Sequence, residues 1–381
     1  MSRIPFFRHD LGALEVASLA AALEGPILTT GDLVAEFERR FAALVDVPHA
    51  VALTSCTGAL HLALAALGIG PGDEVVTTPM TFIATATAIL QAGARPVFVD
   101  VEPDTGNLDV GRIDAALTPR TRAIVPVHLF GQMCDMRALR ALADRHGLRV
   151  VEDAAHCVEG GRDGVRPGAL GDAACFSFYA TKSLTSGEGG ALVTRDAALA
   201  ERVRLLRLHG MTSSAADRER HGYRPWDMIA LGWKYNMDNL QAALLLPQLP
   251  RVAANHARRT ALAARYREAL RALEGLRLPA VRGTTRHAWH LFAVWCDRAR
   301  DAVLAGLERA GVGVTVNYEP VHLTRYFRQT FGYAPGAFPV AEAIGAATLS
   351  LPLYATMPEA DVDEVVARLT AILAEARATS R

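Results

Sequence analysis

The chain has 381 residues, 51% of them hydrophobic, and its 40 lysines and arginines balance 40 aspartates and glutamates. This balance leaves no net field that would favour nucleic acid or an anionic membrane, and no uncharged apolar stretch is long enough to span a bilayer. The charged N-terminus lacks the apolar core of a signal peptide, and five scattered cysteines without a CxxC pair indicate neither a zinc site nor a disulfide framework. We expect a cytoplasmic protein without a metal.

The first half of the chain has the pattern of an α/β domain. Two amphipathic helices, 11–24 and 32–45, precede short β-branched runs that alternate with helical stretches. The predicted strands are 74–77, 96–99, 123–127 and 149–151, and the predicted helices are 59–67, 82–92 and 135–146. This alternation indicates a mostly parallel sheet, whose ligands bind at the carboxyl ends of the strands. Asp100, His128 and Asp153 follow strand runs, so all three are candidates for one crevice.

The second half predicts a smaller α+β domain. A helix over 196–209, a polar surface loop over 211–228 and a long helical segment over 237–273, broken near Pro247 and Pro250, lead into it. Its predicted strands are 289–296 and 312–318, and its predicted helices are 299–310, 339–347 and 359–377. We place the large domain at 1–245, and the linker helix with the small domain at 246–381.

One lysine gives the clearest indication of chemistry. The stretch Cys175–Gly190 is an apolar, aromatic run that ends at Lys182 and continues into a glycine-rich turn. Desolvation lowers the pKa of a lysine, and a lysine that forms a Schiff base must be neutral. Asp153 ends a strand of valines, where a carboxylate can hold a pyridine nitrogen protonated; a structural salt bridge or a helix cap is the alternative. Together, Lys182 and Asp153 predict pyridoxal phosphate (PLP).

Hydroxyls and a glycine open the helix that begins within Thr54–His61. Backbone N–H groups at such a start bind phosphate well, although an ordinary Ser/Thr cap has the same pattern. Beside a PLP lysine, we predict that Thr57 and Gly58 form the phosphate cup and that Ser177 adds a hydroxyl.

Two further side chains are candidates for contact with the pyridine ring. Phe82 can stack on the ring, or it is a core phenylalanine at a helix start, where most phenylalanines go. His156 follows Asp153 by three residues and can bond the ring's 3-oxygen or orient Asp153; as a lone histidine it is more often structural.

Together these segments resemble the DegT/StrS family of PLP-dependent nucleotide-sugar aminotransferases. The likeness runs nearly from end to end, and ordered matches of this number are far more specific than one motif. The matching segments are Ile4-Pro-Phe-Phe-Arg8, Thr30-Gly31, Glu36-Phe-Glu38, Pro71-Gly-Asp-Glu-Val75, Thr81-Phe82, Pro96-Val-Phe-Val-Asp100, Pro126-Val-His-Leu-Phe-Gly131, Glu152-Asp-Ala-Ala-His156, Gly171-Asp172, Phe176-Ser-Phe178, Thr181-Lys182, Gly187-Glu-Gly-Gly190, Val321-His-Leu323 and Leu351-Pro352.

The resemblance implies an α/β, fold-type-I PLP enzyme that works as a homodimer with sites at the subunit interface. Lys182 matches the Schiff-base lysine, Asp153 the partner of the pyridine nitrogen, and Phe82 the aromatic that stacks on the ring. His156 falls where the family has Gln or His near the ring oxygen. Thr57, Gly58 and Ser177 match the phosphate site.

The resemblance also implies residues that reach beyond one cofactor. The segment Gly232–Asp238 looks like the one that a neighbouring subunit lends, so Asn236 and Lys234 would reach the other protomer's cofactor phosphate. His322 aligns with a substrate-pocket histidine, and we place Lys234 and Tyr318 in the same pocket. The Lys-Tyr-Asn form of the segment resembles the subgroup that acts at C4 of 4-keto sugars.

The function implied is transfer of an amino group, from L-glutamate, to a nucleotide-linked 4-keto or 3-keto deoxysugar through an internal aldimine and pyridoxamine phosphate. One alternative is a sugar dehydratase, a branch in which histidine replaces the lysine that stands here as Lys182. Another is an aminotransferase for a cyclitol or other non-nucleotide keto substrate. The last is a non-catalytic PLP-binding regulatory protein.

Overall fold

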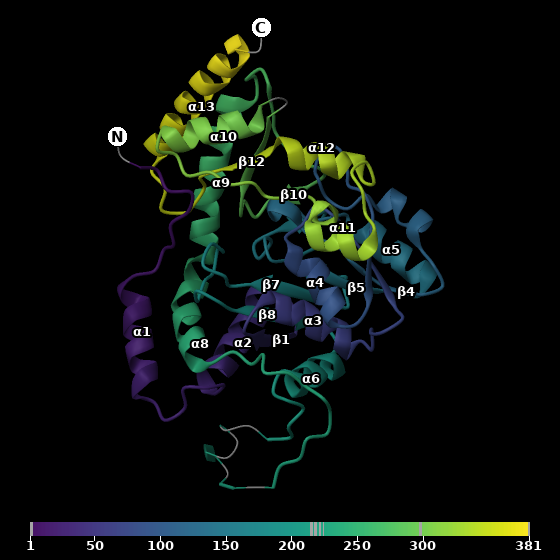
Figure 1. The fold of residues 1–381 in the computed structure, drawn as a ribbon. Coiled ribbons are helices and arrows are strands. Elements are labelled where there is room, and N and C mark those ends of the chain that lie inside the picture. Colours follow the sequence, from purple (N-terminus) through teal and green to yellow (C-terminus); the bar gives the residue numbers. More distant parts are fainter. Residues whose placement is uncertain are drawn as a thin grey trace.

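The computed structural model describes residues 3–213, 216, 219–220, 222–223, 225–296 and 299–379, so the predicted loop over 211–228 lies partly outside the described residues. A seven-stranded sheet with the order β1-β8-β7-β5-β4-β2-β3 forms the centre of the molecule (Figure 1). Its strands are β1 (His49–Leu53), β2 (Glu74–Thr77), β3 (Arg95–Phe98), β4 (Thr121–Val125), β5 (Arg149–Asp153), β7 (Ala173–Ser177) and β8 (Gly190–Thr194). Strand β8 runs against both of its neighbours, and the other pairings are parallel. The predicted mostly parallel α/β sheet is confirmed.

Helices cover both faces of this sheet. One hydrophobic core includes side chains of α2 (Asp32–Val45), α5 (Met136–His146) and α8 (Asn239–Leu245). The other includes side chains of α3 (Cys56–Ala66), α4 (Ile83–Gln91) and α6 (Ala197–Leu206). Successive strand residues point to opposite faces, so Val150 belongs to the first core and Val151 to the second. Burial on both faces explains why these strands are almost continuous apolar runs.

A second, smaller sheet has three strands in the order β12-β11-β9. Its strands are β9 (Leu276–Arg277), β11 (Phe292–Cys296) and β12 (Thr348–Leu351), and its helices are α9 (Val252–Leu270), α10 (Arg300–Arg309), α12 (Pro339–Ala347) and α13 (Glu359–Thr379). Helix α1 (Ala13–Glu24) lies along α8 beside the large sheet, whereas the N-terminal end reaches the region of α10 and α13 (Figure 1). There Ile4 forms a β-bridge with Val312.

The long helical segment is interrupted where its prolines predicted. Helix α8 ends at Leu245, a 3-10 turn runs from Leu246 to Arg251, and α9 begins at Val252. The predicted strand over 312–318 is wrong: isolated bridges at Val312 and Thr315 take its place. The domain boundary between 245 and 246 stays a prediction. In the part of the chain that the structure describes, no helix is both long and apolar enough to cross a membrane.

Candidate active site

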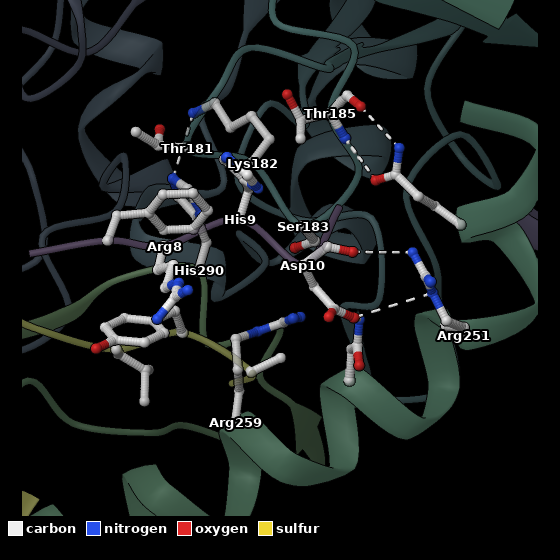
Figure 2. A pocket seen from close by; sticks show the side chains of 16 residues that line it. Arg8, His9, Asp10, Thr181, Lys182, Ser183, Thr185, Arg251, Arg259 and His290 are labelled. Atoms are coloured by element: carbon white, nitrogen blue, oxygen red, sulfur yellow. Dashed lines mark hydrogen bonds and ion pairs between the residues drawn. The ribbon is translucent and has the colours of Figure 1, made fainter. Parts of the chain in front are cut away.

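Lys182 lies in the loop that follows β7, where its backbone N–H donates to the carbonyl of Tyr179. Its side chain is half-buried, and Nζ lies 3.3 Å from Nε2 of His290 (Figure 2). Burial lowers the pKa of this amine to about 8, although the charge of Asp153 and the thiol of Cys56 oppose the shift. Near neutral pH the amine therefore gives up its proton far more readily than an exposed lysine does.

Asp153 is the last residue of β5, and β5 pairs with β7, the strand that leads to Lys182. The carboxylate is buried: Oδ2 accepts a hydrogen bond from the Thr85 hydroxyl at 2.7 Å, and Oδ1 accepts one from the backbone N–H of Ala155 at 3.1 Å. Burial raises the pKa of Asp153, and the bonds from Thr85 and Ala155 and the charges of Lys182 and His128 oppose this. A protonated ring nitrogen beside it would remove much of the remaining cost of burying the charge.

His156 presents a buried polar atom without a partner. Its Nε2 lies 3.1 Å from the hydroxyl of Tyr318, whereas its Nδ1 is buried and has no partner among the described residues. Burial raises the pKa of Tyr318 and lowers that of His156, so the phenol keeps its proton and the imidazole is neutral. When the phenol donates to Nε2, the proton of the imidazole sits on Nδ1. That N–H can donate to an oxygen of a ligand.

The predicted phosphate cup lies at the start of α3, next to the end of β7. Ser55 caps the helix and accepts a hydrogen bond from the backbone N–H of Gly58 at 3.0 Å, so the capping interpretation is correct for this serine. Ser177 pairs with Gly190 across β7 and β8. A Cβ atom at Gly190 would overlap the backbone of Ser55, so the glycine lets the strand end approach the helix start. The phosphate roles of Thr57, Gly58 and Ser177 stay predictions.

Phe82 does not lie in the core. It is the residue just before α4, its side chain is 56% exposed, and its ring centroid lies 6.0 Å from that of Tyr318. The core interpretation is therefore wrong. The stacking role of Phe82 stays a prediction. The same helix start supplies Thr85 to Asp153.

The remaining predicted residues have partners of other kinds. The Asn236 amide donates to Thr30 at 2.7 Å and accepts from Lys234 at 2.6 Å, and Lys234 is exposed. His322 is fully buried and lies 2.9 Å from a carboxylate oxygen of Glu342. This places His322 in an aromatic cluster with Phe338 and not in the group around Lys182. Its role as a substrate-pocket residue stays a prediction.

Two strand-end residues are occupied elsewhere, so the prediction of one shared crevice is wrong for them. Asp100 accepts from the backbone N–H groups of Val340 and Ala341 at the start of α12. His128 is buried against Glu152, with Nε2 2.8 Å from Oε2. Both therefore stabilise the fold, and Asp153 alone of the three lies beside Lys182.

Two residues of the group around Lys182 and Asp153 were not predicted from the sequence. His290 lies just before β11, more than a hundred residues after Lys182. Thr85 lies in α4 among alanines and other threonines, so no local pattern distinguishes it. The closely spaced His287 and His290 ahead of an apolar strand were the one available signal.

The residues in this group fit PLP. A buried carboxylate suits the ring nitrogen, the unpaired Nδ1 of His156 suits the 3-oxygen, and the amine of Lys182 suits the aldehyde carbon. The exposed side chain of Phe82 lies near Tyr318, the residue that bonds His156. Together with the doubly covered parallel sheet, this donor set defines a PLP-dependent aminotransferase of fold type I.

The chain belongs to the DegT/DnrJ/EryC1/StrS aminotransferase family, whose model matches residues 9–370. It is 45% identical over 370 residues to the spore coat polysaccharide biosynthesis protein SpsC of Bacillus subtilis, covering 95% of each chain. Among solved structures it is similar to DesV of S. venezuelae in complex with a ketimine intermediate, with 38% identity, a TM-score of 0.91, and 97% and 98% of the two chains covered. It is also similar to DesI in the presence of its TDP-sugar product, with 35% identity, a TM-score of 0.89, and 100% and 95% covered.

Proposed function

We propose that this sugar aminotransferase moves an amino group from L-glutamate to a nucleotide-linked keto-deoxysugar. The observation that supports it most is the placement of Asp153 at the end of β5 and of Lys182 in the loop that follows the neighbouring strand β7. The product described for DesI and the pathway named for SpsC favour a nucleotide-linked sugar as acceptor. The Lys-Tyr-Asn segment around Tyr235 favours the keto group at C4.

Each residue has one task in this proposal. Bound PLP supplies an electron sink for the pair of electrons left when the donor's α-carbon loses its proton. The amine of Lys182 would take that proton at Nζ and hold it close by for its return. Asp153 would hold a proton on the ring nitrogen, and Nδ1 of His156 would donate to the 3-oxygen. Positioned proton transfer of this kind contributes about 10²–10⁴-fold in rate.

Assay of purified protein with glutamate and a panel of keto sugars tests the proposal. The panel holds dTDP- and UDP-linked 3-keto and 4-keto deoxysugars and one keto-cyclitol. We expect mass spectrometry to find an amino sugar and 2-oxoglutarate in equal amounts with a nucleotide-linked 4-keto sugar. Amination of the cyclitol alone would contradict the proposal that the acceptor is a nucleotide-linked sugar. Loss of a hydroxyl without gain of nitrogen would indicate a dehydratase.

We further propose that the enzyme is a homodimer in which Asn236 reaches the cofactor phosphate of the partner subunit. In its own chain, the backbone of Asn236 bridges Leu53 beside α3, while its side chain bonds Thr30 and Lys234 and not the cup residues. Its amide group is thus fixed beside the start of α3 in its own chain, and the contact with a second copy is the part of the proposal to be tested.

Mixed dimers of two defective variants test this arrangement. In Asn236→Asp a carboxylate should repel the phosphate and weaken cofactor binding, and Lys182→Ala lacks the amine. If Asn236 acts across the interface, a mixed dimer has one intact site, so random exchange of the two inactive variants should restore about a quarter of wild-type turnover. No restoration on mixing would place Asn236 in the site of its own chain.

A further inference from the structure

The amine of Lys182 has one side-chain hydrogen-bonding neighbour in the described structure, His290, with Nζ and Nε2 3.3 Å apart. His290 is buried and precedes β11 of the small sheet, whereas Lys182 follows β7 of the large sheet. The contact therefore joins the two sheets at the reacting nitrogen itself. The pocket in Figure 2 is lined by both residues and by Phe7–Asp10 of the N-terminal segment.

His290 is neutral and can accept a hydrogen bond. Burial lowers its pKa well below the usual range, and the positive charges of Lys182 and Arg259 add to this. A neutral imidazole has one ring nitrogen with a free lone pair, and Nε2 is the nitrogen that faces the amine. Arg259, the permanent cation nearby, is paired with the buried Glu159.

The ring of His290 is held in place. Its centroid lies 4.4 Å from that of His156, with the planes inclined by 38°, and His156 is in turn bonded to Tyr318. A Lys182 side chain alone would have several rotamers available to its free amine. A fixed acceptor selects among them.

We propose that His290 is a positioning residue for Lys182: whenever the ε-amino group is not covalently bound, Nε2 of His290 accepts a hydrogen bond from it and holds it beside Asp153. This deepens the proposed function and rests on the role given there to Lys182. It also gives the amine a fixed place from which it can reach the donor's α-carbon and then return.

The pKa of the Lys182 amine should depend on its hydrogen bond with His290. Burial lowers the pKa of the amine to about 8, and Asp153 and Cys56 oppose this shift. A hydrogen bond to the ammonium is stronger than one to the neutral amine, so the contact with His290 favours the protonated form. Loss of the acceptor should therefore lower the pKa further.

The chain makes this pKa measurable, because it contains two lysines, Lys182 and Lys234. The full-length protein, freed of cofactor, is treated briefly with acetic anhydride over a range of pH, and mass spectrometry follows the two lysine peptides separately. Lys234 is exposed and serves as the internal reference in every sample.

We expect His290→Leu to lower the apparent pKa of Lys182 by about one unit, a tenfold loss of proton affinity. His290→Gln, whose amide oxygen can accept the same bond, should restore most of it. His287→Leu is the matched control, because His287 is equally buried and stacks on Trp289 but bonds a backbone N–H. It should leave the pKa of Lys182 unchanged.

An unchanged pKa in His290→Leu, or an equal shift in His287→Leu, would overturn the proposal. If the leucine variant does not fold by circular dichroism, ring nitrogen NMR of histidine-labelled wild type gives the answer. The ring nitrogen signal of one buried histidine should then change with the titration of Lys182, and this change should be absent in Lys182→Met. If no histidine signal behaves in this way, the contact is contradicted. Neither readout needs a donor or an acceptor, so failure of the proposed aminotransfer would be seen separately.

Discussion

Replacement of Lys182 by alanine is expected to abolish aminotransfer, with turnover lowered by more than about 10⁴-fold, the upper range for one positioned proton-transfer group. The variant loses the covalent attachment of the cofactor as well as the proton carrier. The amine of Lys182 is suited to both tasks because burial lowers its pKa to about 8. Steady-state assay with glutamate and the best acceptor of the panel measures the loss.

The Lys182→Arg variant tests whether the positive charge alone is sufficient or whether a reactive amine is needed. Arginine keeps a cation near Asp153 but stays protonated and forms no Schiff base, so it should be as inactive as alanine. Circular dichroism should show both variants folded, because the side chain is only half-buried. Turnover within an order of magnitude of wild type in either variant would remove Lys182 from its proposed role.

Replacement of Asp153 by asparagine is expected to lower turnover by about 10²–10³-fold, the usual cost of losing one aligned electrostatic group. The amide can keep a bond with Thr85, which lies 2.7 Å from Oδ2, but it carries no charge to hold a proton on the ring nitrogen. A single-turnover reaction with glutamate alone, followed by the absorbance of the cofactor, measures the effect on the first half of the reaction.

Glu152→Gln is the matched control for Asp153. Glu152 is the neighbouring buried carboxylate, but it faces His128 and the backbone N–H groups of Gly168 and Gly171. Loss of the Glu152 charge should lower the melting temperature, while the half-reaction with glutamate keeps its rate. Equal rate losses in the two variants would show that general damage to the sheet, and not the charge at Asp153, controls the reaction.

Local patterns in the sequence were sufficient for the fold and for part of the site. Apolar β-branched runs predicted four strands of the large sheet (β2, β3, β4 and β5) but not β1, β7 or β8, and the helix over 32–45 matches α2. Lys182 was predictable because an apolar, aromatic run ends there, and Asp153 because it ends a strand of valines. The sheet order brings β5 and β7 together, which no local pattern states.

Other residues were not predictable because their partners lie far away in the chain. The end of a strand indicates where a side chain lies but not what it bonds, so Asp100 and His128 were placed in the crevice although they bond elsewhere. The segment 312–318 alternates like a strand, yet Ile4 and Ser350 each give it one isolated bridge. His290 meets Lys182 only when the small sheet packs on the large one.

We propose that the amine of Lys182 forms the covalent bond to PLP. Because the chain has two lysines, reduction of the purified, PLP-loaded protein with borohydride and peptide mapping by mass spectrometry can distinguish them. We expect a reduced cofactor adduct on Lys182 and an unmodified Lys234. An adduct on Lys234, or a cofactor that washes away unreduced from both lysines, would contradict it.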